Sequence, residues 1–522
     1  MNSHCIRLVK IQLSALVKGR KWSGKEIFVA AAYGILGLFL AGYSFALAYS
    51  FGAMQLASVV PAYAMAVTGL ITLFFTALKA NGILFAYQDY EMLMALPIRT
   101  GTIITSRFLT MYLLNLAFTV LVMLPMGVGY CLQVRPGLFF YPIWFLGMVM
   151  APLIPTTIAT FLGLLIIWFS SRFRHANLVT TAVSILLFAA FMAFCLFGQM
   201  TEHAEITAAQ IRDLGEMIAW QIHRIYPPSF LFEQAVNQES PGWLLIFAGI
   251  SVIWYGIFLK LISWKYVELN TALTTSHTKG NYQVTELREA SPVKAICIKE
   301  LRRFFGCPIY TLNMGMGVVM AVLFAGACLV MGLDKMETVL GIPGMGQKFA
   351  VFSPFILAGL LGMTCTTCVS LSLEGKNLWI LRSLPLAPEK IYRGKIAMNL
   401  LLTIPASLLC SLLLAAVVQG NVIQMVLLFL VPAVYSLFHS VLGMWINLKF
   451  PNYQWTTETA VVKQSMASLC GILLGMLNVV PPVLLTVFLP EDFQMLPGVV
   501  FVVLWAAGAA GIWHFIKKQK FW

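Results

Sequence analysis

Charged residues are scarce in this sequence, and acidic residues are the scarcest. Asp and Glu number 20 among 522 residues, and all charged residues together make up 10% of the chain. A soluble globular protein carries about 25% charged residues. Hydrophobic residues make up 60% of the chain, so the composition excludes a soluble globule and predicts an integral membrane protein.

The interiors of the long apolar stretches contain no acid at all, because each Asp and Glu falls in a polar segment or at the end of a stretch. Ion-coupled carriers place a titratable side chain inside the helix bundle. His439 is the one ionisable residue expected deep in a span, and a single histidine there more often hydrogen-bonds a neighbouring group than it carries a function. This pattern argues against an ion-coupled transporter.

Nucleotide-binding and catalytic motifs are missing as well. Gly375 and Lys376 in "SLEGKN" lack the first glycine and the Ser or Thr of a phosphate-binding loop, so the chain is not expected to hydrolyse ATP alone. No Ser/His/Asp or paired-carboxylate arrangement falls on facing spans, which leaves no catalytic residue to name. The sequence predicts neither an enzyme nor a cofactor.

Cysteine usage excludes a disulfide framework, because only Cys131 among the ten cysteines approaches the outside. Cys365 and Cys368 form a C-x-x-C pair within an apolar span, where packing of small residues is favoured over a metal or redox pair. No metal site is predicted. The weak alternative is zinc on an outer loop that carries Glu202, His203, Glu205 and His223.

Long apolar runs dominate what is present. A helix needs roughly 20 apolar residues to cross the hydrocarbon. Twelve stretches meet that length, so the chain is predicted to be all-α with twelve spans. They are 27–50, 58–85, 103–130, 138–169, 177–198, 243–264, 309–331, 351–372, 395–418, 422–448, 465–489 and 496–516.

The net charge of +14 is distributed unevenly between the two sides of these spans. Most of the 34 Lys and Arg residues fall on segments that share a side with both termini. The outer loops carry only Arg135, Arg212, Arg224, Lys335 and Lys348. By the positive-inside rule both termini are cytoplasmic, and the expected location is the cell membrane. The basic balance therefore indicates contact with anionic lipid headgroups and not with nucleic acid.

A short amphipathic segment precedes the first span. In "IRLVKIQLSALVKGRKW", Ile6, Val9 and Leu13 fall on one helical face, against Arg7 and Lys10. Such a helix is expected to lie on the inner leaflet.

The spans divide six and six around a polar segment, which predicts a first half at 1–264, a cytoplasmic linker at 265–306 and a second half at 307–522. "DYEMLMALPIRT" (89–100) and "NLWILRSLPLAP" (377–388) match at an offset of 288 residues (89 to 377). The same offset aligns Arg107 with Lys395. Because each half has an even number of spans, the two repeats are predicted to be parallel.

The halves differ most on the outside, where residues 199–241 form a long excursion with a helical stripe ended by "YPP". Two interpretations are open. The segment is either a lid or rim helix, or a helix that rests on the outer leaflet.

The two Leu-Pro segments, residues 89–100 and 377–388, lie between spans on the predicted cytoplasmic side. Proline disfavours helix in the residue before it, so each segment is expected to form a short helix that breaks at Leu-Pro before the next span begins. The next helix is expected to begin at Thr100 or Thr102 after the first segment and at Pro388-Glu389 after the second. Exposed apolar residues rimmed by charge indicate either a lipid contact or a docking surface. The predicted docking residues are Asp89, Glu91, Leu93, Leu96, Pro97, Ile98, Trp379, Leu381, Leu384 and Pro385.

The sequence resembles the permease subunits of bacterial type-2 ABC exporters in their fused, double-length form. The resemblance lies in the two Leu-Pro segments, in "IKELRRFFGCPIYTLN" (298–313) and in "NLKFPNYQWTTETAVVKQS" (447–465). The first half departs from the pattern, since "IQLSALVKGRKW" (11–22) only loosely echoes "KELRRFFGCPIY" (299–310). The resemblance implies export driven by separate ATP-binding-cassette ATPase subunits, in two copies, that engage the Leu-Pro segments as coupling helices.

The nature of the cargo follows from the expected lining of the path between the halves, which is apolar and aromatic with hardly any charge. This favours a hydrophobic or amphipathic cargo such as a lipid, a peptide or a drug-like molecule. Two alternatives stay open: an ion-coupled secondary transporter, and a membrane scaffold protein that transports nothing.

Overall fold

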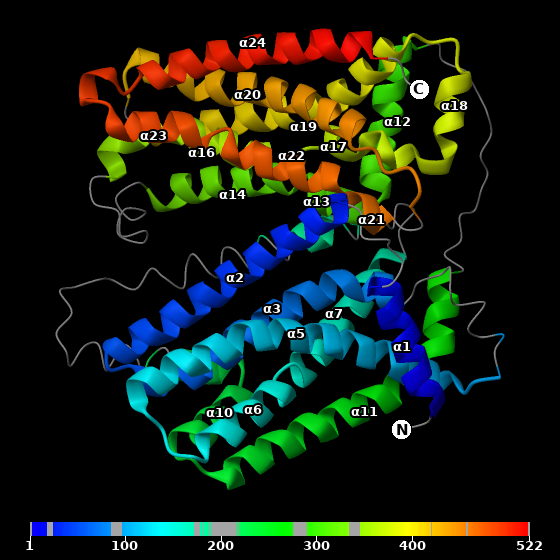
Figure 1. The fold of residues 1–522 in the computed structure, drawn as a ribbon, viewed down its shortest axis with the longest axis vertical. Helices are drawn as coiled ribbons and strands as arrows, with labels where there is room; N and C mark the ends of the chain where they lie inside the picture. The colour runs from blue at the N-terminus through cyan, green and yellow to red at the C-terminus, as the bar shows by residue number, and fades with distance from the viewer. Residues whose placement is uncertain are drawn as a thin grey trace. The chain divides into compact units, whose positions relative to one another are not determined.

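The computed structural model describes residues 3–17, 24–84, 95, 97–171, 178–179, 181–186, 189, 217, 219–274, 290–332, 345–418, 420–455 and 458–519. Within these residues the regular structure is entirely helical, which confirms the predicted all-α class. The chain forms two compact units, Met1–Ala176 with Ala204–Lys279 (unit 1) and Asn177–His203 with Gly280–Trp522 (unit 2). Figure 1 shows both.

The long helices account for most of the predicted spans. Nine described helices are long and apolar enough to cross a membrane, and a tenth is obtained when the bent pair α13 (Pro308–Met314) and α14 (Met316–Met331) is counted as one. The predicted span 58–85 coincides with η1 (Ala57–Val59) and α3 (Val60–Leu84). Most of the predicted span 177–198 lies outside the described residues. The chain is therefore a multi-pass membrane protein.

Unit 1 begins with the 15-residue helix α1 (Ser3–Val17) and continues through further helices of different lengths. These are α2 (Gly24–Ala53), η1 (Ala57–Val59) with α3 (Val60–Leu84), α5 (Thr100–Val134), α6 (Phe140–Met150), α7 (Leu153–Ser171), α10 (Pro228–Asn237) and α11 (Pro241–Thr274). Helices α2 and α3 both pack against α5, which makes α5 the centre of the unit.

Helix α1 does not present its whole apolar side to lipid. Cys5, Leu8 and Val9 are buried and α1 packs against α5, whereas Ile6 and Ile11 are exposed. Within the predicted apolar face, Val9 is therefore covered by the protein, whereas Ile6 stays exposed.

The outer excursion of unit 1 resumes a helical course after "YPP". Helix α10 packs against α3, α6 and α11. The ring of Phe232 is fully buried beside Trp144, and it occupies the space where a side chain on Gly147 would lie. The two interpretations concern the helical stripe before "YPP", most of which lies in residues 190–216 and 218, outside the described residues.

Unit 2 repeats the same kind of order. After α12 (Pro292–Gly306), α13 and α14 come α16 (Met345–Gly362), α17 (Thr367–Ser370), η2 (Ser372–Asn377), α18 (Leu378–Ser383), α19 (Pro388–Ala415) and α20 (Val422–Lys449). The unit ends with α21 (Glu458–Val462), α22 (Met466–Leu477), α23 (Val480–Phe488), η3 (Glu491–Phe493) and α24 (Leu496–Lys518). Within unit 2, α12 and α18 run across the direction of α19, α20 and α24 at one end of these helices (Figure 1).

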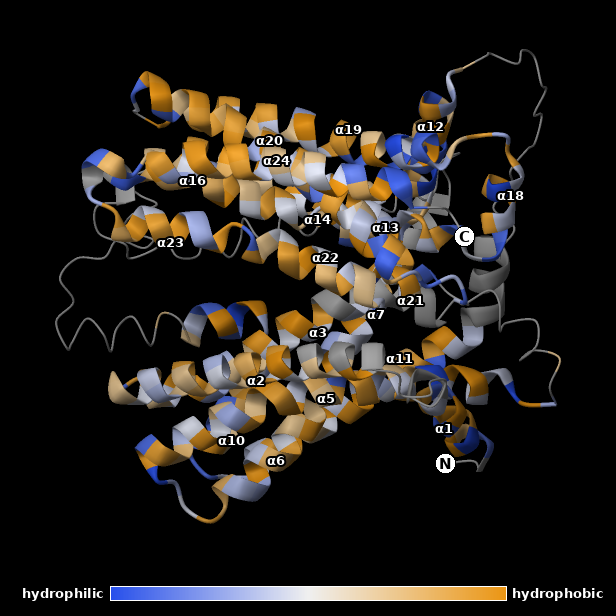
Figure 2. Ribbon diagram, turned by 45° about the horizontal axis from the view of Figure 1, so that its top comes forward, coloured by the Kyte–Doolittle hydropathy of each residue, from blue (hydrophilic) through white to orange (hydrophobic). Residues whose placement is uncertain are grey.

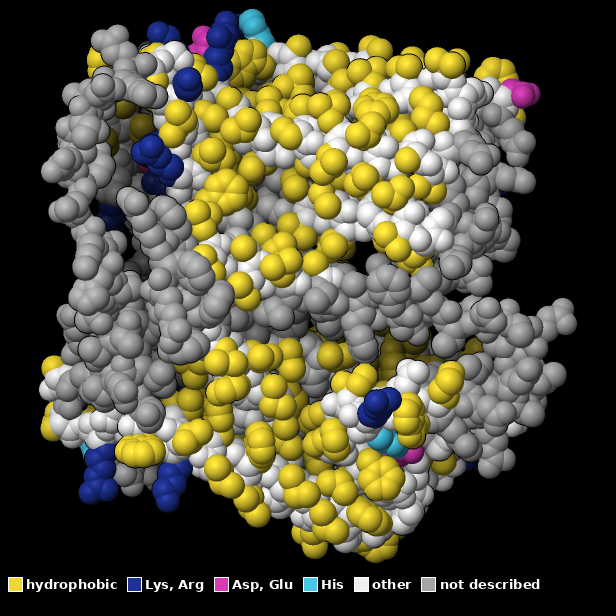
Figure 3. Space-filling view, turned by 180° about the vertical axis from the view of Figure 1, so that it is seen from behind, with side chains coloured by type: hydrophobic (Ala, Val, Ile, Leu, Met, Phe, Trp, Pro, Cys, Tyr) yellow, Lys and Arg dark blue, Asp and Glu magenta, His cyan; other side chains and the backbone are white. Residues whose placement is uncertain are grey.

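Polar and apolar residues separate along the length of unit 2. In Figure 2 the sides of the long helices are mainly hydrophobic, whereas hydrophilic residues gather around α12 and α18. Figure 3 shows the same separation on the surface, with hydrophobic side chains along the helices and Lys and Arg near their ends. This distribution is what a bilayer around the helices requires.

Candidate functional site

Three chain segments that were singled out in the sequence meet at one end of unit 2. They are α12, the second Leu-Pro segment (residues 377–388) with η2 before it, and the segment 447–465 that follows α20. Helix α12 packs against α19, and α21 contacts both α13 and η2. We refer to this end, formed by α12, η2, α18 and residues 447–465, as the candidate coupling site.

Helix α12 is built to lie against the bundle on one side. The Ser291 side chain accepts a hydrogen bond from the Lys294 backbone N–H, and proline occupies the first helical turn. Ile296, Glu300 and Phe304 recur at four-residue spacing and are buried. One of the three residues on the buried face is therefore an acid.

Helix α18 is defined by a sharp corner at each end. Gly375 has φ +52°, a conformation that side-chain-bearing residues rarely adopt, and it lies under the Trp455 indole. At the other end Leu384 is extended before Pro385, and α19 begins at Pro388 with Glu389 in its first turn. The predicted break at Leu-Pro and the predicted start of the next helix are both confirmed.

The predicted docking residues of this segment divide between two faces of α18. Trp379 is 65% exposed and Leu384 is 41% exposed, and Pro385 is exposed too. Leu381 is only 5% exposed and packs against Ile296 of α12 and against α19. The expectation that Leu381 projects outward is therefore wrong, because α12 covers that face of α18. Ile380, 47% exposed, joins the outer face instead.

The first Leu-Pro segment is described only in part. Asp89, Glu91, Leu93 and Leu96 lie outside the described residues. Pro97 is exposed and Ile98 is half-buried in a bend, and α5 begins at Thr100, one of the two predicted starting points.

The corner before α18 is held by the segment after α20. The Asn447 side-chain oxygen accepts hydrogen bonds from the backbone N–H groups of Leu371 (2.8 Å) and Ser372 (3.2 Å). The Trp455 indole N–H donates to the Ser372 carbonyl oxygen at 2.7 Å. These bonds satisfy backbone groups where the helical pattern is interrupted, so the corner is fixed from outside.

A cluster of ionised side chains lies behind the corner. Lys395 of α19 is fully buried, and its Nζ is 2.8 Å from Glu300 Oε1 and 2.8 Å from Glu374 Oε1. Lys299 and Arg303 of α12 approach Glu374 at 2.7 Å and 3.2 Å. We call Lys299, Glu300, Arg303, Glu374 and Lys395 the ionic cluster. It joins α12, η2 and α19.

The electrostatics of the cluster favour its charged state. Burial of the Arg303 guanidinium opposes its charge, but the carboxylates of Glu374 and Glu300 outweigh burial and raise the pKa of Arg303 above its usual value. Nearby, burial and a hydrogen bond to Glu458 raise the pKa of the Cys307 thiol to about 12. The thiol donates to the Glu458 carboxylate over 2.7 Å and links α12 to α21.

Sequence reasoning missed the ionic cluster. Glu300 and Glu374 lie near span ends, where an acid is normally solvated, and Lys395 was noted only as the partner of Arg107 in the repeat. The available signal was the spacing in "IKELRRFFG", where Glu300 falls on the same helical face as Ile296 and Phe304.

The other predicted residues form no further chemical site. Cys365 and Cys368, expected as free packing residues, are joined by a disulfide next to Gly443 and Gly471. His439 is buried and stacks on Tyr435, with ring centroids 5.9 Å apart.

The outer-loop residues of the zinc alternative are described only in part. Glu202, His203 and Glu205 lie outside the described residues, whereas His223 pairs with Glu233 at 2.6 Å. Burial raises the pKa of Glu233 despite this histidine. Among the described residues no group of three or more potential metal ligands occurs.

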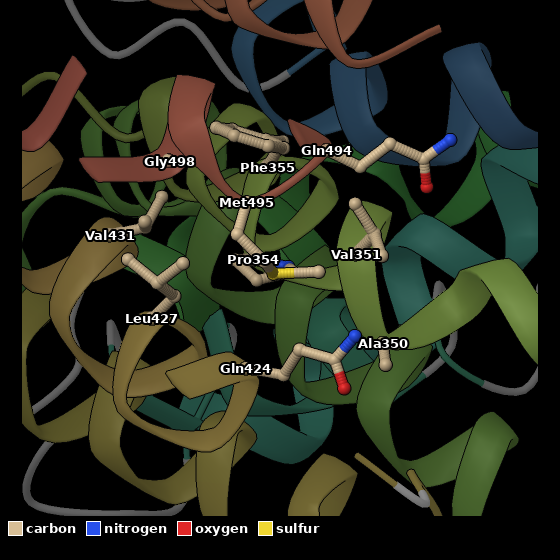
Figure 4. A pocket seen from close by; sticks show the side chains of 10 residues that line it. All are labelled: Ala350, Val351, Pro354, Phe355, Gln424, Leu427, Val431, Gln494, Met495 and Gly498. Atoms are coloured by element: carbon tan, nitrogen blue, oxygen red, sulfur yellow. The ribbon is translucent and has the colours of Figure 1, made fainter. Parts of the chain in front are cut away.

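A small pocket lies at the opposite end of unit 2, where α16, α20 and α24 begin. Figure 4 shows that apolar side chains such as Val351, Phe355 and Leu427 line it, together with the amides of Gln424 and Gln494. Its lining holds no charged or nucleophilic group, so it offers no chemistry of its own.

Comparison with known proteins gives a family and no closer relative. A family model described as a membrane protein of 12 TMs matches residues 25–507. No curated protein and no solved structure matches the chain.

Proposed function

The chain belongs to this family of membrane proteins with 12 TMs, and from that premise we propose that it is the permease subunit of a type-2 ABC exporter. In this proposal separate ATPase subunits, in two copies, bind on the cytoplasmic side and supply the energy. The chain itself provides the path through the membrane and is not an enzyme. Both termini are cytoplasmic, and the protein resides in the cell membrane.

One observation carries the proposal: α18 and the residue after it expose Trp379, Ile380 and Leu384, and the corner before α18 is held by hydrogen bonds. A helix that served only to lie in the headgroups would have no need for the bonds from Asn447 and Trp455 to the corner before it. Exposed apolar residues on a rigid support are typical of a docking surface. A coupling helix must be rigid because it transmits force.

The cargo is proposed to be hydrophobic or amphipathic. Within the described spans, most buried polar groups are Ser, Thr and Asn. Such residues hydrogen-bond neighbouring helices and leave a low-charge interior.

Truncating the exposed apolar side chains of α18 tests the docking role. The triple substitution Trp379→Ala, Ile380→Ala and Leu384→Ala should leave the protein inserted in the membrane, because these side chains are exposed. It should lower at least tenfold the amount of an ATPase with a phosphate-binding loop that co-purifies with the chain.

The matched control replaces three other exposed apolar residues with Ala: Leu412 near the end of α19, and Val422 and Ile423 at the start of α20. Retained ATPase in the α18 variant, or equal loss in the control, would contradict the proposal.

The second candidate is an ion-coupled transporter, and the buried Lys395 with its two carboxylates is the observation that favours it. Uptake of a labelled lipid analogue into vesicles on a pH gradient, without ATP, would support this candidate and exclude the first.

A further inference from the structure

All three hydrogen-bond donors of the Lys395 ammonium are already in use. It offers three N–H donors, and three acceptors surround it: Glu300 Oε1, Glu374 Oε1 and the Ser370 carbonyl oxygen at 2.9 Å. A group that is saturated in this way is a poor candidate for binding a transported ion. Its role must lie in what it holds together.

Lys395 and two of its partners flank α18 on the chain. Ser370 and Glu374 precede α18, and Lys395 is the eighth residue of α19, which follows it. Glu300 comes from α12, which also covers the inner face of α18 through Ile296. The entry to α18, the exit from α18 and the helix beneath it are therefore tied to one buried point.

We propose that Glu300, Glu374 and Lys395 are positioning residues that make α12, η2 and α19 a single rigid lever under α18. A displacement of α18 is then passed into α19, because the ion pairs cannot stretch without exposing buried charge. The role in transport rests on the proposed function, whereas the rigidity is a property of the chain alone.

Unit 1 provides an internal comparison. At the offset of 288 residues that aligns the Leu-Pro segments, Glu300 corresponds to Gln12 of α1, a neutral amide. Gln12 contacts hydroxyls of α5: its Nε2 donates to Ser106 at 3.4 Å and its Oε1 accepts from Thr110 at 2.6 Å. The substitution Glu300→Gln therefore gives unit 2 the residue that unit 1 already has.

Amide hydrogen exchange on the purified full-length chain in lipid nanodiscs measures the rigidity directly. Glu300→Gln should speed exchange at least tenfold in α18 and η2, and leave α20 and α24 unchanged. Glu300→Asp, which keeps the charge, should restore exchange to within threefold of the parent chain. The matched control is Glu389→Gln, which breaks a half-exposed pair with Arg393 on the same α19 and should change nothing in α18.

Amide hydrogen exchange on the complex with the ATPase shows whether α12, η2 and α19 move together with α18 or only form a stable core. On addition of MgATP, exchange should change in α18 and α19 together in the parent chain, but in α18 alone in Glu300→Gln.

Three results would overturn the inference. They are unchanged exchange in α18 of Glu300→Gln, a uniform acceleration across unit 2 that Glu300→Asp does not reverse, or an ATP response that still reaches α19 in Glu300→Gln. If exchange in α18 is slower in the parent chain than in Glu300→Gln but no ATPase binds the chain, the proposed function would be overturned and the rigidity would stand.

Discussion

In each unit the first helix packs against a later, longer one, α1 against α5 and α12 against α19, but different chemistry joins the two pairs. In unit 1 the amphipathic helix α1 is joined to α5 by the neutral side chains of Gln12 and Thr110. In unit 2 the corresponding α12 is joined to α19 by Glu300 and the buried Lys395. A buried charge that loses its partner is far more costly than an amide that loses a hydroxyl. Breaking the Glu300–Lys395 contact is therefore expected to cost more than breaking the contact between Gln12 and Thr110.

The helix interiors show the same device in both units, with one difference. Asn115 of α5 donates to Thr76 at 2.8 Å and to Thr156 at 2.9 Å, and so bridges α3 and α7. Asn399 of α19 donates to Ser440 of α20 and accepts from the backbone N–H and the hydroxyl of Thr366. It accepts a backbone bond because the helix breaks between α16 and α17, which leaves that N–H without a helical partner.

The largest effect is expected at Lys395. Lys395→Met removes the positive charge between two buried carboxylates and should lower the free energy of unfolding by about 3–5 kcal/mol. Chemical denaturation in one detergent, with the parent chain alongside, measures the difference. Glu300 then loses its nearest cation and keeps only the longer contacts to Lys299 (3.8 Å) and Arg303 (3.7 Å), so adding Glu300→Gln to Lys395→Met should recover part of the loss. A double variant that is less stable than Lys395→Met would contradict the assigned pairing.

The next largest effect separates the two asparagines. Asn399→Ala strands the Thr366 backbone N–H in an apolar interior and should cost about 2 kcal/mol. Asn115→Ala leaves two hydroxyls, one of which, on Thr156, still donates to the Pro152 carbonyl oxygen, and should cost about 1 kcal/mol. Denaturation of the two variants side by side gives the difference, and equal losses would show that the helix break places no demand on Asn399.

Much of the fold followed from the sequence because a membrane imposes simple rules. The length of the apolar runs predicted the spans, and proline predicted the end of α18 and the start of α19, since both effects act within a few residues. The match between the Leu-Pro segments identified the region of the candidate coupling site.

The parts that could not be predicted depend on contacts between distant segments. The sequence of α18 does not indicate which of its apolar residues, Trp379 or Leu381, is exposed. Leu381 is buried because Ile296 of α12 packs against it. The charges of Glu300 and Lys395, 95 residues apart, look like solvated ends until both are seen in contact. Neither residue carries a local signal of burial strong enough to identify the pair.

The smallest effect is expected at the neutral junction of unit 1. Gln12→Ala removes two hydrogen bonds between uncharged groups, one of them 3.4 Å long, and leaves hydroxyls that have other acceptors: Ser106 donates to Ile103 and Thr110 to Ser106. The loss should be about 1 kcal/mol in the same denaturation measurement. Glu300→Ala, the equivalent change in unit 2, leaves Lys395 with one carboxylate and should cost at least twice as much. If Gln12→Ala proved as costly as Glu300→Ala, the two junctions would be equally strong, and the stiffness of unit 2 could not be attributed to its charges.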